Sequence, residues 1–533
     1  MPVAASASLA TLHNFTTAAP ASAATMASDA MDMHRRTRYS ILGGPRGPPR
    51  RNSSLSGRAV GLCTCCALCA AALLLATLFH APKFQPPNLP AYCSAPTTGR
   101  EGAPQDGLAL WAVVLAIRHG DRSAIFEMPG ANATPTWRCR PVGAEQRAAA
   151  AGVRVVSAAS GAPLKRRLLP TTTGDGAACA PGQLTPTGFA QHVALGAHFG
   201  RAYAPLLAAL AHNHSRSVGG SRAPPAYVRS TDYTRTQMSA AALLSSLLPP
   251  SLRPPQAAPA VMATYEDEAR EMMHGAGLAS SSKIAGQDGG GEKTRRGACA
   301  RAGALATAQI DAFAPDAAAV AELREIFGGE AAALSPTHVA DVLYAHACHA
   351  LRPPCGGGGK CATPSLAQAY WNMGDRHYCD KYTGAAGGRR ASELAMHPLL
   401  VEIVGRLEAA HAGTGERLAL LSGHDTVVAQ LIAALGVMGD SRHCKWPPYA
   451  SHVAFELWRA PGAAAAASAP RVRLLFNGVV VTHLVPACAS ASADVHVADG
   501  GGSELCDLAA FARGVAAIVR PHASWEAACR EPP

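Results

Sequence analysis

An unbroken apolar run that ends in a cluster of charge constrains this chain more than any other feature. The run, Leu110–Ile117, is followed directly by the pentapeptide RHGDR at 118–122. A short continuous apolar run is typical of a strand buried on both faces, as in the parallel sheet of an α/β fold. Such sheets bind ligands beyond the carboxyl ends of their strands. The run therefore predicts a buried strand that leads into a functional site.

The residue types in the pentapeptide favour phosphoryl chemistry. Arg118 and Arg122 each offer a planar fork of N–H donors that matches phosphoryl oxygens. His119, between them, carries an imidazole that can act as a nucleophile. Taken alone, the pentapeptide also fits a solvated basic turn with a structural histidine, so other segments must decide.

A second strand, turn and helix follow at 418–436. Leu418–Leu421 is apolar, Ser422–Thr426 is a polar turn, and residues 427–435 form an apolar helical stretch with Gly436 after it. We expect Ser422 or Thr426 to cap this helix, which places a histidine and a carboxylate where a helix amino terminus favours an anion. The alternative is an ordinary capping Asp beside a packed His.

A third segment supplies further guanidinium groups. A short apolar entry at 227–228 precedes Arg229 and Arg235, and a helical stretch rich in Ala and Leu follows. Spacing does not decide which arginine is functional. A separate helix is predicted from Thr185 as cap and Pro186 as first residue, with His192 and His198 as packed or polar-face histidines.

These segments together resemble the histidine acid phosphatase family. The resemblance is carried by RHGDR at 118–122, GQLTPTGFAQHVALG at 182–196, VRSTDYTRTQMSA at 228–240, SGHDT at 422–426, PPYASHVAFELW at 447–458 and FNG at 476–478. It implies an α/β fold, a phosphoglycerate-mutase-like three-layer sandwich with an inserted helical cap. One departure is Ser123-Ala124, where the family usually has a small residue and proline.

The resemblance implies a two-step mechanism with a phosphohistidine at residue 119. Phosphoryl oxygens would be bound by Arg118, Arg122, Arg235 and His424. Asp425 would protonate the leaving alcohol, and an acid of this kind needs a raised pKa, so we expect activity at mildly acidic pH. Neither a metal nor a cofactor is implied.

Asp121 is a competing carboxylate within the same pentapeptide. Its position favours a supporting ion pair with a nearby arginine over a catalytic role.

The front of the chain predicts a membrane anchor. Residues 59–80 are uncharged and long enough to cross a bilayer once. Seven arginines lie in the preceding tail, 1–58, and the positive-inside rule then leaves that tail in the cytosol. We expect a disordered tail, a stem at 81–107, and a single-pass type II protein of the Golgi or another secretory membrane. A cleaved signal peptide is the alternative.

Cysteines and glycosylation sequons fit a luminal catalytic part. Twelve cysteines follow the apolar span, an even number that allows up to six disulfides. Asn132 and Asn213 lie in Asn-X-Ser/Thr sequons and are candidate glycosylation sites. The four cysteines within the span are not predicted to bind zinc.

Charge restricts the partners. The formal charge is +11, of which +5 lies in residues 1–58 and +6 in the remainder. Aromatic residues are 5% of the chain and are not interleaved with basic ones, so nucleic-acid binding is not expected. A small phosphomonoester, a phosphorylated sugar or a glycan is the expected substrate, and the sequence leaves a homodimer open.

The catalytic domain is predicted at 108–530, with the helical cap within about 200–400 and a good candidate at 316–351. Residues 148–176 are rich in Ala, Gly and Ser and are predicted to be a surface loop or linker.

Four functions are compatible with these features. Within the family, a membrane-anchored branch that removes the 2-phosphate from xylose in the proteoglycan linker has the most similar architecture. A broad-specificity acid phosphatase is the first alternative. A catalytically silent membrane glycoprotein that binds phosphate or sugar is the alternative from another class, and a phosphotransferring mutase is a further one.

Overall fold

The structure, a computed structural model, describes residues 90–532 with gaps. The gaps are 134–142 except residues 137 and 139, 166–178 except 168 and 169, 217–225, 254–257, 267–271, 275–298, 463–468 and 490–503. The predicted tail at 1–58, the anchor at 59–80 and the first part of the stem, residues 81–89, lie outside the described residues. Within them, no single helix is long and apolar enough to cross a membrane, and one sharply bent pair passes by length and composition alone.

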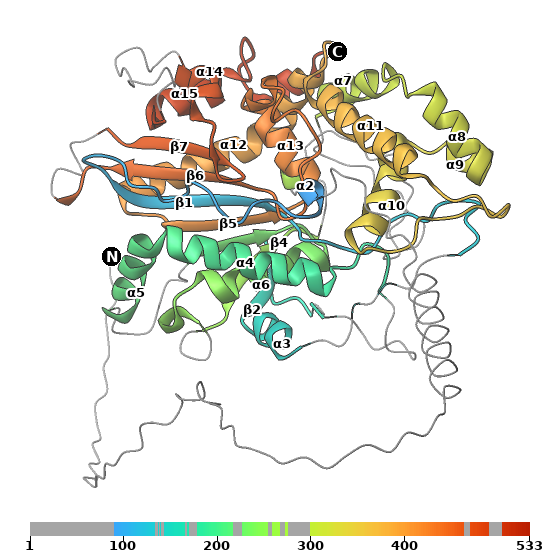
Figure 1. Cartoon of the computed structure of the whole chain (residues 1–533). Helices are drawn as coiled ribbons and strands as arrows, with labels where there is room; N and C mark the ends of the chain where they lie inside the picture. Colours follow the sequence, from blue (N-terminus) through green and yellow to red (C-terminus); the bar gives the residue numbers. More distant parts are fainter. Residues whose placement is uncertain are drawn as a thin grey trace, which may run out of the picture. The chain divides into compact units, whose positions relative to one another are not determined.

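A mixed nine-stranded sheet lies at the centre (Figure 1). Its strand order is β2-β4-β3-β5-β1-β6-β7-β8, with β9 also paired to β7. The strands from β2 to β1 in this order run parallel, and β6, β7, β8 and β9 join antiparallel. The strands are β1 (Ala109–Arg118), β2 (Val153–Ser157), β3 (Tyr227–Ser230), β4 (Ala260–Thr264), β5 (Leu418–Gly423), β6 (His452–Arg459), β7 (Arg471–Phe476), β8 (Val479–Val480) and β9 (Cys506–Asp507).

Helices cover both faces of this sheet, because successive strand residues point to opposite sides and both sides are apolar. Val113, Leu115 and Ile117 of β1 pack against one helical layer, shown below the sheet in Figure 1. That layer contains α4 (Pro186–Ala202), α5 (Ala204–Arg216) and α6 (Thr234–Leu247). The predicted α/β fold with a central sheet and helices is confirmed.

The intervening residues of β1, Ala112, Val114 and Ala116, face the second layer. This layer contains α10 (Pro336–Cys348), α11 (Pro364–Thr383), α12 (Gly388–Ala412), α13 (Asp425–Ala434) and α15 (Leu508–Ala517). The other described helices are α2 (Pro90–Cys93), α3 (Ala144–Ala151), α7 (Ala300–Asp311), α8 (Ala317–Phe327), α9 (Gly329–Ala332), α14 (Pro486–Ala489) and α16 (Trp525–Arg530).

Residues 148–176 correct one expectation. Instead of a loop throughout, this stretch contains the end of α3 and the edge strand β2, which pairs in parallel with β4. The five residues of β2, VRVVS, are β-branched at three positions and fit a pleated edge. The surrounding Ala- and Gly-rich sequence hid this short signal.

Helix starts show one prediction confirmed and one wrong. Thr185 caps α4, and its Oγ1 accepts a hydrogen bond from Gly188 N at 3.1 Å. The cap position of α13 is instead His424, so neither Ser422 nor Thr426 caps that helix. Ser422 Oγ donates to the carbonyl oxygen of Thr236, because Ser422 is still inside β5 and faces α6.

Twelve described cysteines pair into six disulfides, which agrees with the even count expected from the sequence. The pairs are Cys93–Cys348, Cys139–Cys179, Cys299–Cys529, Cys355–Cys361, Cys379–Cys444 and Cys488–Cys506. Two of them join segments more than 200 residues apart.

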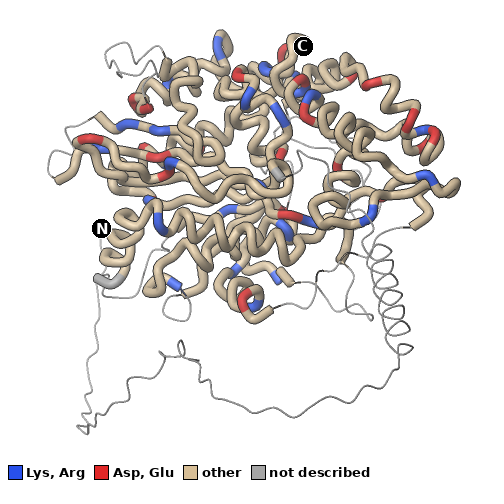
Figure 2. Tube along the Cα trace, viewed as in Figure 1, with Lys and Arg blue, Asp and Glu red and all other residues tan. Residues whose placement is uncertain are grey.

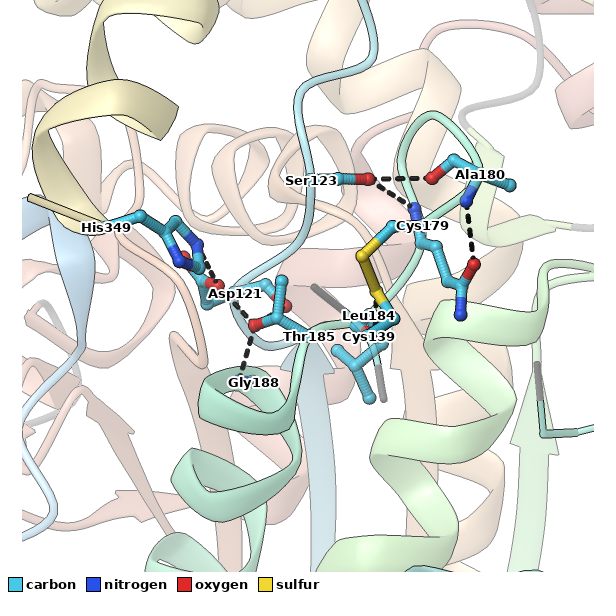
Figure 3. The surroundings of a disulfide bond; sticks show 10 residues. Asp121, Ser123, Cys139, Cys179, Ala180, Leu184, Thr185, Gly188 and His349 are labelled. Carbon is cyan, nitrogen blue, oxygen red and sulfur yellow. Dashed lines mark hydrogen bonds and ion pairs between the residues drawn. A yellow bond between two sulfur atoms is a disulfide. The ribbon is translucent and has the colours of Figure 1, made fainter. Parts of the chain in front are cut away.

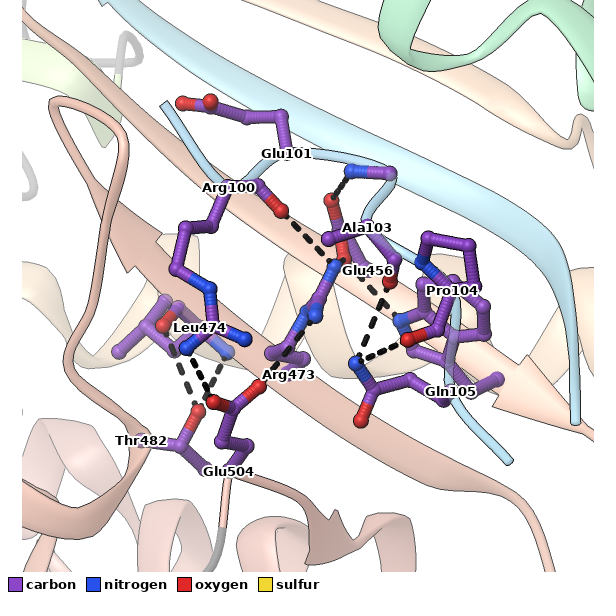
Figure 4. A network of polar contacts seen from close by, with 12 residues as sticks. Arg100, Glu101, Ala103, Pro104, Gln105, Glu456, Arg473, Leu474, Thr482 and Glu504 are labelled. Atoms are coloured by element: carbon purple, nitrogen blue, oxygen red, sulfur yellow. Dashed lines mark hydrogen bonds and ion pairs between the residues drawn. The ribbon is translucent and has the colours of Figure 1, made fainter. Parts of the chain in front are cut away.

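A buried polar network fixes the segment before β1 to the sheet (Figure 4). Arg473 of β7 and Glu456 of β6 form a buried ion pair at 2.8 Å, and Glu456 also accepts from Gly102 N at 2.7 Å. Nearby, the Glu101 carboxylate lies 2.9 Å from His198 Nε2 and 2.8 Å from His452 Nε2. His198 and His192 are both buried, as expected of packed histidines. The network holds the segment before β1 on the sheet through hydrogen bonds and ion pairs.

Candidate active site

The carboxyl ends of three adjacent strands form the site. β5 lies between β1 and β3 and is parallel to both, with Arg118 opposite Gly423 and Ser230 opposite Ser422. The polar segments that follow these strands therefore meet at one edge of the sheet. The first of them, residues 118–122, is called the catalytic loop below.

His119 is buried at the start of this loop. Its Nδ1 lies 2.8 Å from the carbonyl oxygen of Gly120, which can only accept, so Nδ1 carries the proton and Nε2 keeps its lone pair. Burial, together with the charges of Arg235, Arg118 and Arg122, holds the pKa of His119 well below its ordinary value. The imidazole is therefore neutral and can act as a nucleophile through Nε2.

Arg118 is fully buried and held from several directions. It donates to Tyr92 Oη at 3.0 Å and to the carbonyl oxygen of Pro447, and its guanidinium lies 4.4 Å from the ring centroid of Tyr449. It also forms an ion pair with Asp425 at 3.0 Å. These contacts fix its orientation beside His119.

Arg122 is held by a residue that the sequence did not single out. Asp341 of α10 accepts two hydrogen bonds from the Arg122 guanidinium, at 2.8 and 3.2 Å. Both side chains are buried. One signal was present in the sequence: Asp341 is a lone carboxylate within the apolar stretch 339–345 of a predicted helix.

The structure separates the two arginines that spacing could not. Arg229 points to α12 and pairs with Glu402 at 2.5 Å. Arg235 lies over the ring of Tyr233, 4.4 Å from its centroid, and forms no ion pair within the described ranges. Burial and the charge of Arg122 lower the pKa of Arg235 to about 10, so it is still a cation at neutral pH. Arg235 thus adds positive charge beside His119.

His424 lies across from His119, with ring centroids 5.6 Å apart. Its Nε2 is 3.0 Å from Thr231 Oγ1, a residue that follows β3. All six residues predicted for catalysis and phosphate binding thus lie at the same edge of the sheet.

Asp425 follows His424 and departs from the expected electrostatics. Burial alone would raise its pKa, but Arg118, the Trp446 indole N–H and Arg122 outweigh burial and lower the pKa below its ordinary value. The Trp446 N–H donates to Asp425 Oδ2 at 3.0 Å. The expectation of a raised pKa is therefore wrong for this structure, because it did not include the buried cation next to this carboxylate.

Asp121 forms no ion pair with any of the described arginines, contrary to expectation, and contacts Thr185 and His349 instead (Figure 3). Its Oδ1 accepts from Thr185 Oγ1 and lies 2.7 Å from His349 Nε2. The neighbouring arginines are already paired, Arg118 with Asp425 and Arg122 with Asp341. Asp121 therefore links the catalytic loop to α4 and to the end of α10.

Figure 2 shows that charges of both signs are spread over the elements. The three arginines around His119 are therefore a local concentration of positive charge.

Among the residues that the structure describes, no group of three or more His, Cys, Asp or Glu is arranged to hold a metal ion. The candidate glycosylation residues Asn132 and Asn213 are both exposed.

Comparison with known proteins agrees with this arrangement. Residues 109–288 and 371–477, more than half of the chain, match the family described as "Histidine phosphatase superfamily (branch 2)". The matched ranges contain all six predicted catalytic and phosphate-binding residues.

Two curated relatives cover the chain to different extents. Counting factor 60 of Dictyostelium discoideum is 26% identical over 389 residues, which are 69% of this chain and 81% of that protein. The 2-phosphoxylose phosphatase 1 of Homo sapiens is 30% identical over 154 residues, only 28% of this chain and 29% of that protein.

Solved structures include the apo form of a Hafnia alvei phytase, which is 14% identical, with a TM-score of 0.46 over 81% of this chain and 100% of that chain. A multiple inositol polyphosphate phosphatase from Bifidobacterium longum, in complex with phosphate, is 13% identical. Its TM-score is 0.45, and the match covers 83% of this chain and 100% of that chain.

Proposed function

This chain belongs to the histidine phosphatase superfamily, branch 2, and is a phosphoric monoester hydrolase; we propose that it works through a phosphohistidine at residue 119. One observation carries this proposal. His119 Nε2 keeps a lone pair while three arginines and His424 surround the ring. A neutral nucleophile set among cations suits attack on an anionic phosphoryl group.

In the first step, His119 Nε2 forms a bond to phosphorus while the ester P–O bond breaks. Arg118, Arg122, Arg235 and His424 donate to the non-bridging oxygens and stabilise the charge that they carry in the transition state. Asp425 gives its proton to the departing alkoxide oxygen, which leaves as an alcohol.

Substrate binding provides the protonated Asp425 that this step needs. In the structure Arg118 pairs with Asp425 and keeps the pKa of that carboxyl low. A bound phosphoryl group brings negative charge close to Asp425 and competes for Arg118. Both effects raise the pKa of Asp425, so the carboxyl takes up a proton when the substrate is in place.

In the second step, water attacks the phosphohistidine and the N–P bond breaks. Asp425, now a carboxylate, accepts a proton from the water, and inorganic phosphate leaves. His119 Nε2 regains its lone pair, and Asp425 is again protonated, so the cycle balances without a metal or an oxidant.

For the substrate, we propose a phosphorylated sugar or glycan of the 2-phosphoxylose type, processed in the secretory pathway. Partial similarity to 2-phosphoxylose phosphatase 1 supports this substrate. The predicted type II anchor at 59–80, the six disulfides and the exposed Asn132 and Asn213 support the luminal location. A broad-specificity acid phosphatase is the second candidate, supported by the same site.

The test is phosphate release by the purified, detergent-solubilised full chain near pH 5, about the acidic pH expected for an acid–base pair of this kind. A 2-phosphoxylose oligosaccharide, phytate and a simple alkyl phosphate are compared, each beside His119→Ala. Selective release from the oligosaccharide supports the glycan substrate, and similar rates on all three favour the broad phosphatase. A folded wild-type protein that releases no phosphate, or an equally active His119→Ala, would refute the proposed mechanism.

A further inference from the structure

The catalytic loop is held by two elements that are far apart in the sequence and joined by a disulfide. α2 and α10 are linked by Cys93–Cys348, across a sequence separation of 255 residues. The residue before Cys93 is Tyr92, and the residue after Cys348 is His349. Both of these neighbours contact charged side chains of the loop, so the disulfide lies between two loop contacts.

Three side chains from these elements each contact a different charged residue of the loop. Tyr92 Oη accepts from Arg118 at 3.0 Å, His349 Nε2 lies 2.7 Å from Asp121, and Asp341 pairs with Arg122 in bidentate fashion. Figure 3 shows the His349–Asp121–Thr185 part of this arrangement.

The two elements also contact one another and the loop backbone. Tyr344 of α10 stacks on Tyr92 of α2, with centroids 3.7 Å apart. Gln191 of α4 donates to the Cys93 carbonyl at 2.6 Å and accepts from the Asp121 backbone N–H at 2.8 Å. The disulfide therefore constrains the position of the catalytic loop through contacts of both side chains and main chain.

We propose that Tyr92, Cys93, Asp341, Cys348 and His349 form a clasp that sets the position of the catalytic loop, with Asp341 and His349 as positioning residues of the reaction. The clasp acts on phosphate binding, because it orients Arg118 and Arg122 rather than touching the reacting atoms. A misplacement of such groups by about 1 Å can reduce a rate about a hundredfold. This inference rests on the proposed function, since it concerns the same phosphate site.

A second disulfide offers a matched control. Cys299–Cys529 closes a comparable sequence separation, 230 residues, but it packs with Leu394 and Ala395 in a separate apolar cluster. Loss of either disulfide releases a similar amount of chain entropy in the unfolded state. Only loss of Cys93–Cys348 should alter the catalytic loop.

The experiment compares two double variants of the full chain, Cys93→Ser with Cys348→Ser and Cys299→Ser with Cys529→Ser. Turnover of 4-nitrophenyl phosphate and the Kd of inorganic phosphate by calorimetry are measured, with thermal unfolding as the check of folding. The first variant should raise the phosphate Kd and lower kcat/KM by about tenfold or more. The second should lose thermal stability to a similar extent but keep the wild-type Kd and kcat/KM. Equal losses of phosphate affinity in both variants would overturn the proposal.

Single substitutions keep the test decisive if the first variant fails to fold. Asp341→Asn preserves shape but removes the charge that orients Arg122, so it should weaken phosphate binding. His349→Ala should also weaken it, whereas His349→Gln, which keeps a polar group with an N–H donor beside Asp121, should restore most of the affinity. Unchanged phosphate affinity in both Asp341→Asn and His349→Ala would refute the clasp.

Combined variants test whether these residues act as one unit. The effect of Asp341→Asn should not add to that of losing Cys93–Cys348, but should add to that of losing Cys299–Cys529. Phosphate binding is measured without turnover, so an inactive wild type would count against the proposed function and leave the test of the clasp intact.

Discussion

His119 is the residue on which the chemistry depends, and its surroundings keep it uncharged. Burial and the arginines at 118, 122 and 235 all disfavour an imidazolium. Because the lowered pKa keeps the neutral form as the pH falls, the nucleophile persists in mildly acidic solution.

This leads to a prediction about titration. In histidine-labelled NMR spectra, the His119 resonance, assigned through His119→Gln, should stay nearly constant as the pH is lowered through about 6.5, where an ordinary histidine gains its proton. A short unstructured peptide that contains one histidine serves as the titrating control. A His119 resonance that titrates together with that control would contradict the low pKa.

A second prediction concerns Asp425 as general acid. Asp425→Asn should slow hydrolysis of an alkyl phosphate by about a hundredfold to ten-thousandfold, because a carboxamide cannot protonate the leaving oxygen. The loss of hydrolysis rate should be far smaller for 4-nitrophenyl phosphate, because its leaving group needs no proton. The comparison requires kcat for both substrates; equal losses would rule out the acid role.

A third prediction separates the two arginines around β3. Arg235→Met should weaken inorganic phosphate binding about tenfold to a hundredfold, as expected for loss of a charged hydrogen bond of about 1.5–3 kcal/mol. Arg229→Met removes the partner of Glu402 instead and should mainly lower thermal stability. Calorimetry and thermal unfolding of both variants provide the check, and a similar loss of phosphate affinity in both would refute the assignment.

At the scale of elements, the catalytic loop lies directly on the amino-terminal turn of α4. A Cβ added to Gly120 would lie 2.3 Å from the carbonyl oxygen of Gly188, and one added to Gly188 would lie 2.1 Å from that of Asp121. The backbone of the catalytic loop therefore contacts the backbone of α4 directly, and there is no space for a side chain at either glycine. This contact needs glycine on both elements.

The fourth prediction follows from this contact. Gly120→Ala must push the loop away from α4 and should lower kcat/KM by about a hundredfold, as expected for a displacement near 1 Å. Gly405→Ala, in α12 where the added Cβ has open space, should leave kcat/KM unchanged and gain about 0.5–1 kcal/mol of stability. Wild-type activity in Gly120→Ala would contradict the packing described.

For the molecule as a whole, disulfides join segments that are close along the chain as well as segments that are far apart. Their separations range from 6 residues in Cys355–Cys361 to 255 in Cys93–Cys348. The long connections restrict the unfolded chain much more than the short one does, since the entropy of loop closure grows with loop length.

The fifth prediction compares two of these bridges. Replacing both members of Cys355–Cys361 by Ser should lower the free energy of unfolding by about 2 kcal/mol, and the same change at Cys299–Cys529 by about 5 kcal/mol, from loop-closure entropy. Urea unfolding of the two variants measures the difference. An equal loss, or a larger one for the short loop, would contradict the entropic account.

Those parts of this protein that depend on local pattern could be predicted from the amino-acid sequence. The apolar runs at 110–117 and 418–421 and the Thr185-Pro186 start of α4 are local signals, because burial, strand formation and helix capping involve neighbouring residues. The polar segments after those runs placed His119, Arg118, Arg122, His424 and Asp425 at strand ends. The even cysteine number and the family resemblance could also be read without a structure.

Features that depend on distances between remote residues required the three-dimensional structure. It showed that Arg235 lies beside His119 while Arg229 pairs with Glu402, that Asp341 holds Arg122, and which cysteines pair. It also reversed the expected pKa of Asp425, because the charge of Arg118, more than 300 positions away in the sequence, lies 3.0 Å from that carboxylate. Electrostatic energy depends on separation in space, and the order of residues along the chain does not give that separation.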